Sequence, residues 1–181
     1  MGFKKDVPSQ KEAVKYLNSM AEKYKEKLIV GGHSKGGNLA VYSAVFCKDS
    51  VKNRIERVIN ADGPGFDKSV ILTDNYKKIL NKIQTYIPQS SIVGRLLEHE
   101  EEYQVVKSIQ KGVMQHDIYS WEIEPTKLIR IPTVTNNSEI FNGIVSDWLK
   151  NTTPEQRENF INIIYEIILE TQAQKTSDFR V

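Results

Sequence analysis

The most informative part of the chain is the decapeptide Leu28-Ile-Val-Gly-Gly-His-Ser-Lys-Gly-Gly37. Its first three residues form an apolar run between charges and glycines, which predicts a short buried strand. Residues 38–46 continue with small and apolar side chains and predict a helix. The pentapeptide between them, residues 32–36, matches G-x-S-x-G, a motif that is meaningful only where a strand runs into a helix. We therefore predict a nucleophile elbow with Ser34 at its tip.

The chemistry of such an elbow explains the residue types around Ser34. A strained turn pushes the serine Oγ out above the sheet, and Gly32 and Gly36 are expected to avoid side-chain clashes in that turn. Gly37 is expected to let the helix approach the sheet closely. The N–H of Lys35 can face the oxyanion, and the N-terminus of the helix adds positive potential at the same point. A phosphate-binding loop is not expected, because the sequence lacks the pattern G-x-x-x-x-G-K-[ST].

Helical and strand patterns alternate on both sides of the elbow. A helix is expected over residues 9–25, and further elements follow the elbow helix: strands at 57–60, 83–87 and 103–108, a short strand or extended segment at 127–131, and helices at 69–80, 139–150 and 154–171. This alternation implies an α/β fold with a mainly parallel sheet, here of about four strands, and helices on both faces. No linker or repeat interrupts the chain, so residues 1–181 are expected to form a single domain.

Composition and charge restrict the classes of protein to consider. The 181 residues carry a formal net charge of +2 without a basic stripe, so we expect no nucleic-acid partner. The single cysteine, Cys47, lies in an apolar stretch and is expected to be buried, and nothing argues for an oxidising compartment. The N-terminus shows no signal-peptide pattern, and no apolar run approaches the ~20 residues of a membrane-spanning helix. We therefore expect a cytoplasmic protein with no cofactor, no metal site and no transmembrane segment.

Three histidines compete for the role of general base. His33 lies inside the elbow, where its side chain should point away from the position of a general base. His99 lies in the charge run of residues 98–102, which is expected to be a solvated face. His116 comes after the last convincing strand, and in α/β-hydrolases the catalytic histidine follows both the serine and the acid along the chain. We therefore predict His116 as the base.

Five segments, in the same order along the chain, resemble one known family: residues 7–17 before the elbow, residues 31–40 of the elbow itself, and residues 60–66, 87–94 and 115–121. The chain resembles the bacterial lipase-like α/β-hydrolases of largely unassigned function that are related to class 3 (fungal-type) lipases. The resemblance extends over nearly the whole chain and implies a serine ester hydrolase. It also implies that residues 115–121 carry the catalytic histidine.

The catalytic acid is the weakest part of this pattern. Class 3 lipases place it after the strand that corresponds to residues 83–87, where this chain has Gln89, Ser90 and Ser91 and no carboxylate. Asp62 is the best replacement, because it lies at the carboxyl end of the preceding strand, although aspartate is also common in turns of this composition. Asp117 would have to fold back onto the neighbouring His116 and ranks lower, and orientation of the histidine by Ser91 stays open.

The resemblance also indicates what precedes the elbow in a full α/β-hydrolase: several strands that supply a second oxyanion donor. Only 27 residues precede Leu28, and they predict one helix. We therefore expect the C-terminal part of an α/β-hydrolase fold with its N-terminal strands absent, and association into homo-oligomers through the open sheet edge.

The expected function is hydrolysis of a small-molecule or lipid ester through an acyl-enzyme, weakened by that truncation. Its expected site consists of Ser34, His116, Asp62 and the Lys35 N–H. The alternative is a non-catalytic hydrolase relic that serves as an interaction or structural module.

Overall fold

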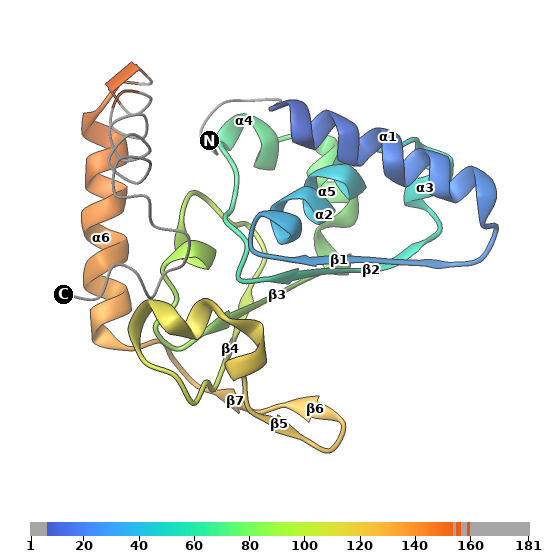
Figure 1. Ribbon diagram of the computed structural model, residues 1–181. Helices are drawn as coiled ribbons and strands as arrows, with labels where there is room; N and C mark the ends of the chain where they lie inside the picture. Colours follow the sequence, from blue (N-terminus) through green and yellow to red (C-terminus); the bar gives the residue numbers. More distant parts are fainter. Residues whose placement is uncertain (1–6, 154, 157–158, 160–181) are drawn as a thin grey trace, which may run out of the picture.

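Helices and strands alternate along most of the chain in the computed structural model, which describes residues 7–153, 155–156 and 159 (Figure 1). The strands are β1 (Leu28–His33), β2 (Ile55–Ala61), β3 (Ile83–Pro88), β4 (Tyr103–Val106), β5 (Ile123–Glu124), β6 (Lys127–Leu128) and β7 (Arg130–Ile131). The α-helices are α1 (Pro8–Lys23), α2 (Lys35–Phe46), α3 (Asp49–Lys52), α4 (Lys68–Ile71), α5 (Asp74–Ile79) and α6 (Asn136–Asn151). The 3-10 helices are η1 (Leu80–Lys82), η2 (Val93–Arg95), η3 (Gly112–His116) and η4 (Ile118–Ser120).

Five strands form one sheet in the order β1-β2-β3-β4-β7. Strands β1 to β4 are parallel, and their register places His33 beside Ala61 and Ala61 beside Tyr86. Strand β7 joins the edge in the antiparallel direction, with Ile131 opposite Val105. The prediction of an α/β fold with a mainly parallel sheet is confirmed. The sheet has one strand more than expected, because the segment at 127–131 contributes β7 as well as β6 of the β5–β6 hairpin.

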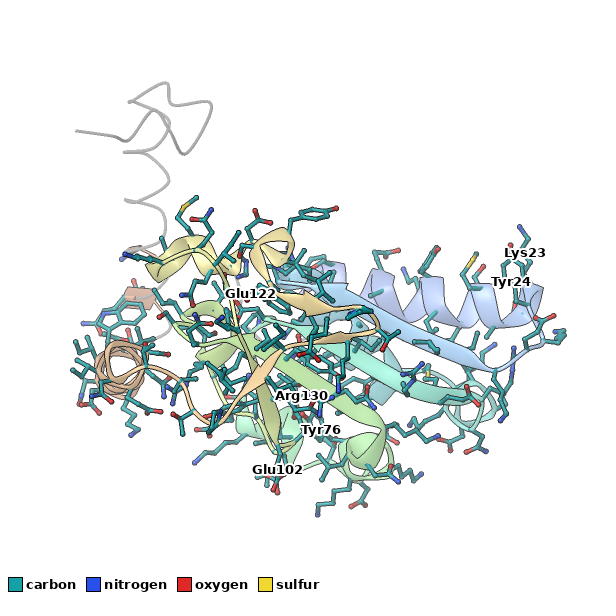
Figure 2. All side chains as sticks on the ribbon, turned by 90° about the horizontal axis from the view of Figure 1, so that it is seen from below. Lys23, Tyr24, Tyr76, Glu102, Glu122 and Arg130 are labelled. Carbon is teal, nitrogen blue, oxygen red and sulfur yellow. The ribbon has the colours of Figure 1, made fainter. Side chains whose placement is uncertain are left out.

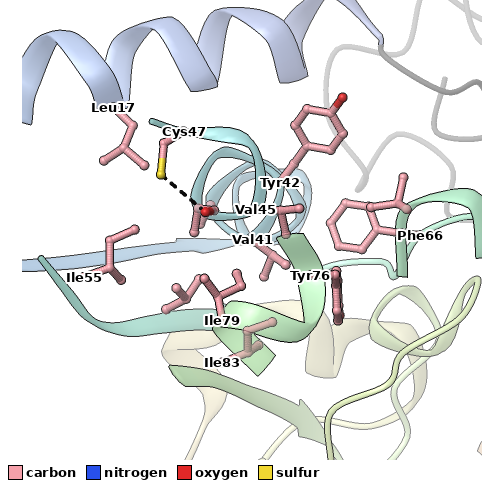
Figure 3. Packing of buried hydrophobic residues seen from close by; sticks show 14 of the residues in the cluster. Leu17, Val41, Tyr42, Val45, Cys47, Ile55, Phe66, Tyr76, Ile79 and Ile83 are labelled. Atoms are coloured by element: carbon pink, nitrogen blue, oxygen red, sulfur yellow. Dashed lines mark hydrogen bonds between the residues drawn. The ribbon is translucent and has the colours of Figure 1, made fainter. Parts of the chain in front are cut away.

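The larger core lies between the sheet and the helices α1 to α5, with α2 at its centre. Helix α2 packs on β1 and β2 and also contacts α1 and α5. Its Val41, Ala44 and Val45 are fully buried, and Tyr76 and Ile79 of α5 close the same core (Figure 3). Burial of one such valine typically stabilises the fold by about 1.5–3 kcal/mol, so this layer fixes α2 firmly on the sheet. The elbow stands at the N-terminus of this helix.

The two faces of the sheet are covered unequally. Helices α1 to α5 all lie over one face in Figure 1, and the segment that contains η3, η4 and the β5–β6 hairpin lies on the other side. There Trp121 packs with Ala61 and Val106 in a second, smaller core. Figure 2 shows this side from below, with Glu122 and Arg130 in the segment that crosses it. The smaller core holds the chain around His116 against the sheet.

Some helices differ from the expected ranges. The segment expected as one helix over residues 69–80 forms α4, α5 and η1, because Thr73 interrupts it and caps α5 by accepting a hydrogen bond from the Tyr76 N–H at 3.2 Å. Helix α6 starts earlier than residue 139, because Thr135 supplies its cap. The helix expected over residues 154–171 lies largely outside the described residues.

A buried carboxylate connects the loop before β4 to α5 and to β3. Glu101 accepts hydrogen bonds from Tyr76 Oη and Thr85 Oγ1, both at 2.6 Å, and its Oε1 lies 3.0 Å from His99 Nδ1. Burial raises the pKa of Glu101, but the hydrogen bonds from His99, Thr85 and Tyr76 outweigh it and lower that pKa to about 2. Burial, and next the charge of Glu101, raise the pKa of Tyr76 far above its ordinary value.

The expectation that His99 lies on a solvated face was therefore wrong. Its side chain is 10% exposed, and Glu101 beside it is buried, whereas Glu98 and Glu100 are exposed. Residues 98–101 alternate between outward and inward positions, as an extended segment does. A count of charges along the sequence cannot show this alternation.

This cluster predicts how stability depends on pH. The pKa of Glu101 in the folded protein lies below its ordinary value of 4.5, so its contribution is complete above that pH and is lost as the pH falls towards 2. A shift of this size corresponds to about 3 kcal/mol. The free energy of unfolding of Glu101→Gln should therefore depend less on pH than that of the unmodified chain between about pH 5 and about pH 2. Urea midpoints across this range measure the difference. Equal slopes for the two proteins would contradict the role given to Glu101.

Candidate active site

Ser34 lies at a strained turn between β1 and α2. Its backbone has φ 56° and ψ −129°, an unusual conformation for a residue other than glycine. The Ser34 N–H donates to the carbonyl oxygen of Ala61 at 2.8 Å, which holds the turn against the end of β2. Strain of this kind is what places the Oγ of an elbow serine above the sheet.

The glycines of the elbow have different roles. A Cβ at Gly32 would lie 2.3 Å from the backbone carbon of Gly36, so the turn requires glycine there. A Cβ at Gly37 would lie 2.1 Å from Asn60 Oδ1 on β2, which agrees with the expected close approach of helix and sheet. The expectation of a clash at Gly36 was wrong, because a Cβ there would meet nothing within 4 Å. It is the backbone of Gly36 that needs the space left at Gly32.

The N–H groups at the start of α2 differ in whether they are available to a ligand. Gly37 N–H and Asn38 N–H donate to the carbonyl oxygen of Ser34, at 2.9 and 3.3 Å. Within the described part of the chain, Lys35 N–H has no acceptor. It follows Ser34 directly and lies at the positive end of the helix dipole, which suits a developing negative charge.

Asp62 follows β2 at the same edge of the sheet and is fully buried. Its Oδ1 accepts hydrogen bonds from Ser91 Oγ at 2.5 Å and from Gly94 N–H at 3.0 Å. Its Oδ2 lies 2.7 Å from His116 Nδ1. The turn after β2 is closed by another residue, because Asn60 Oδ1 accepts the Gly63 N–H at 3.0 Å. The Asp62 carboxylate is therefore directed at the histidine and is not used in its own turn.

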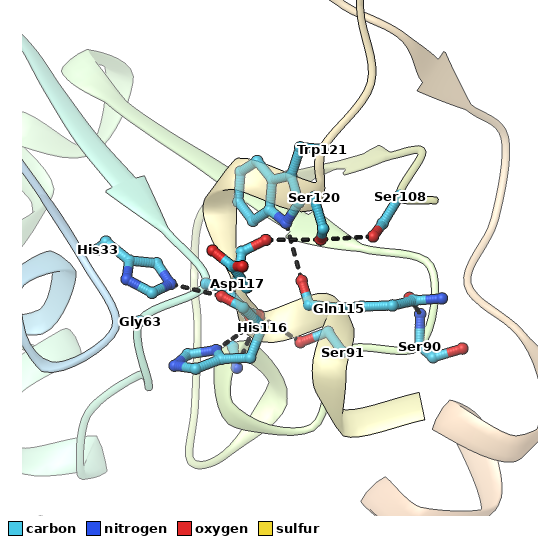
Figure 4. Close-up of polar contacts among 12 residues, drawn as sticks. His33, Gly63, Ser90, Ser91, Ser108, Gln115, His116, Asp117, Ser120 and Trp121 are labelled. Atoms are coloured by element: carbon cyan, nitrogen blue, oxygen red, sulfur yellow. Dashed lines mark hydrogen bonds and ion pairs between the residues drawn. The ribbon is translucent and has the colours of Figure 1, made fainter. Parts of the chain in front are cut away.

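His116 ends η3 and contacts both neighbouring strand ends. Its Nδ1 faces the Asp62 carboxylate, and its side chain is 28% exposed where that of Asp62 is 1% exposed. Its backbone carbonyl accepts a hydrogen bond from His33 Nε2 at 2.7 Å, and the two imidazole rings lie 4.6 Å apart between centroids (Figure 4). Asp117 has a different role: its side chain accepts the Tyr119 N–H at 3.0 Å and caps η4.

The residue before His116 anchors this turn. Gln115 Oε1 accepts the Ser90 N–H at 2.7 Å, and its backbone carbonyl accepts Trp121 Nε1–H at 2.9 Å. Gln115 Nε2 donates to the carbonyl oxygen of Gln110 at 2.8 Å. Ser90 and Ser91 follow β3, where class 3 lipases place the catalytic acid, and each supports the site in a different way. Ser90 holds the turn of the histidine, and Ser91 holds Asp62.

The predicted site residues lie at the carboxyl ends of the parallel strands, but not all of them are in contact with one another. His116 and Asp62 are in direct contact. Ser34 lies at the end of the adjacent strand, and its backbone is close to the residue after Asp62, because a Cβ at Gly63 would lie 2.5 Å from the Ser34 carbonyl oxygen. The Ser34 Oγ makes no hydrogen bond to a described residue. The contact of His33 with His116 was not predicted. Alternation along β1 was the one signal for it in the sequence, because it places His33 on the face away from α2.

The described residues give less support to a cysteine nucleophile, a metal site or a membrane-spanning helix. Cys47 is buried and its Sγ donates to the Ala44 carbonyl oxygen at 3.3 Å. Burial raises the pKa of this thiol, which opposes a role as a nucleophile. No three His, Cys, Asp or Glu side chains among the residues described are grouped as metal ligands. None of the helices in the described ranges is long and apolar enough to cross a membrane.

Comparison with known proteins places the chain in a family. A family model described as Mbeg1-like matches residues 1–166. No curated protein matches the chain. The family expected from the sequence segments, the bacterial group related to class 3 lipases, was therefore wrong: the model that matches is Mbeg1-like, which is itself a lipase-like family.

Proposed function

The chain belongs to the Mbeg1-like family, and from this membership and the geometry around Ser34 we propose that it is a serine hydrolase of carboxylic esters. The observation that carries the proposal is the contact of His116 Nδ1 with Asp62 Oδ2 at 2.7 Å beside the strained turn of Ser34. A buried carboxylate on one imidazole nitrogen leaves the other nitrogen as the base. We also propose that the sheet is part of an α/β-hydrolase fold, whose elbow, acid and histidine follow in this chain order.

The proposed reaction has two halves. Ser34 Oγ attacks the ester carbonyl carbon, and His116 Nε2 takes the proton of the hydroxyl group. Asp62 holds Nδ1–H and stabilises the imidazolium, while Lys35 N–H donates to the oxyanion. His116 then gives its proton to the leaving alcohol, and an acyl group remains on Ser34. Water, deprotonated by His116, attacks this acyl-enzyme. As the bond to Ser34 breaks, His116 returns this proton to Ser34 Oγ, which releases the carboxylic acid and restores both the serine and the neutral imidazole.

Turnover of activated esters tests this proposal. The purified chain should hydrolyse p-nitrophenyl acetate and butyrate faster than the buffer does. Substrates of both lengths are needed, because the proposal covers small-molecule and lipid esters. A folded chain with no turnover and no covalent reaction at Ser34 would instead favour a non-catalytic relic that acts as an interaction module.

Self-association is a further part of the proposal. Within the described residues, β1 pairs only with β2, so one of its edges lacks a partner strand. Ile29 on this strand is 53% exposed, on the face opposite α2. Two copies can pair their β1 edges, and the exposed apolar side chain of Ile29 on that strand favours such pairing over a solvated edge. Sedimentation at tens of micromolar should show a dimer, and Ile29→Lys should shift it towards monomer. A clean monomer of the unmodified chain would contradict this prediction.

A further inference from the structure

The side chain next to Ser34 contacts His116 in two ways. His33 Nε2 lies 2.7 Å from the backbone carbonyl oxygen of His116, and the two ring planes are inclined at 36° with centroids 4.6 Å apart. A carbonyl oxygen can only accept, so His33 Nε2 carries a proton and donates it. Figure 4 shows His33 directed at this carbonyl group.

Strand geometry explains why His33 reaches this point. Gly32 faces α2, because a Cβ at this position would lie 2.3 Å from the backbone of Gly36. Successive side chains of a strand alternate between faces, so His33 must face the opposite side, which η3 covers. The register also places His33 beside Ala61, the residue before Asp62. His33 therefore precedes Ser34 in the chain and lies near Asp62, which follows the neighbouring strand. These are the two residues with which His116 is proposed to act.

We propose that His33 is a positioning residue for His116, and this rests on the proposed function. The bond to Asp62 fixes one atom of the imidazole, Nδ1, and leaves the ring free to turn about it. His33 supplies the remaining restraints, because its N–H holds the backbone of His116 and its ring limits the tilt of the His116 ring. The bond connects residues 83 positions apart and joins the end of η3 to the end of the nucleophile strand.

Two variants separate the hydrogen bond from the ring contact. His33→Phe keeps a ring against His116 and removes the donor. His33→Gln removes the ring and can place an amide N–H near the position of Nε2. The rate at which a fluorophosphonate labels Ser34 should fall between about tenfold and about 100-fold in His33→Phe, because small misplacements of reacting groups have effects of this size. His33→Gln should react several-fold faster than His33→Phe. Equal rates for both variants and the unmodified chain would overturn the proposal, as would a Gln variant as slow as the Phe variant.

A second measurement does not depend on catalysis. The Nδ1–H proton of His116, bonded to Asp62, should give a downfield proton NMR signal that His116→Gln abolishes and thereby assigns. We expect this signal in the unmodified chain and in His33→Gln, and its broadening or loss in His33→Phe; a sharp signal in all three overturns the proposal. If the unmodified chain is not labelled at all, the proposed function fails while the NMR comparison still decides the role of His33. Should His33→Phe not fold, His33→Asn, whose amide is too short to reach the carbonyl, takes its place with the same expected results.

Discussion

Ser34→Ala is expected to reduce turnover of p-nitrophenyl butyrate to the rate of the buffer, because removing the nucleophile from a complete serine hydrolase costs about 10⁶-fold. The reason is chemical, because alanine lacks the Oγ that forms the acyl-enzyme. The substitution removes no hydrogen bond between described residues, since Ser34 Oγ makes none there. Loss of activity should therefore occur without loss of the fold.

Steady-state kinetics and thermal unfolding of the same samples check this result. The two proteins should unfold at similar temperatures, because φ 56° at position 34 strains serine and alanine alike. Ser34→Ala with the turnover of the unmodified chain would mean that the observed hydrolysis comes from another residue or from a contaminant, and the assignment of the nucleophile would be wrong.

Asp62→Asn is expected to reduce turnover by about 10⁴-fold, as loss of the acid does in a serine protease. The amide oxygen can still accept from Ser91 Oγ and Gly94 N–H, so the loop should stay in place. The amide nitrogen then faces His116 Nδ1 and donates to it. The proton of the neutral imidazole moves to Nε2, and that nitrogen can no longer take the proton of Ser34.

Asp117→Asn is the matched control for this substitution. It changes the carboxylate beside His116 in sequence, and asparagine can still accept the Tyr119 N–H that Asp117 accepts. Its turnover should stay close to that of the unmodified chain. A larger loss in Asp117→Asn than in Asp62→Asn, measured with the same ester, would reverse the assignment of the acid.

Local patterns were enough to predict the elbow. The change from an apolar run to glycines and then to small residues lies within residues 28–46, and the structure forms β1 and α2 there. Asp62 could be chosen because parallel strands end at one edge of the sheet, so residues after neighbouring strands lie close together. Patterns within a short stretch of sequence cannot predict every strand. Strand β7 has only two residues, too few for any periodicity, and its place in the sheet depends on pairing with β4.

Contacts between distant segments could not be predicted. His33 was expected to point away from the position of a general base, and alternation along β1 indicates which face it occupies. The sequence does not show that η3 passes over that face and brings the carbonyl of His116 to it. His99 was assigned to a solvated face, although its Nδ1 lies 3.0 Å from the buried Glu101. The partner of His33 lies in another element, and the burial of His99 depends on the extended backbone of residues 98–101. Neither can be read from the charges or from the spacing of motifs in the sequence.

The most direct test is mass-spectrometric location of a fluorophosphonate adduct on the folded chain. The strained turn, the base and the acid together predict one phosphonyl group on Ser34, with a rate that falls sharply in Asp62→Asn and little in Asp117→Asn. An adduct on a different residue, or no adduct at Ser34 in protein shown to be folded, would contradict the proposal that this edge of the sheet is a serine hydrolase site.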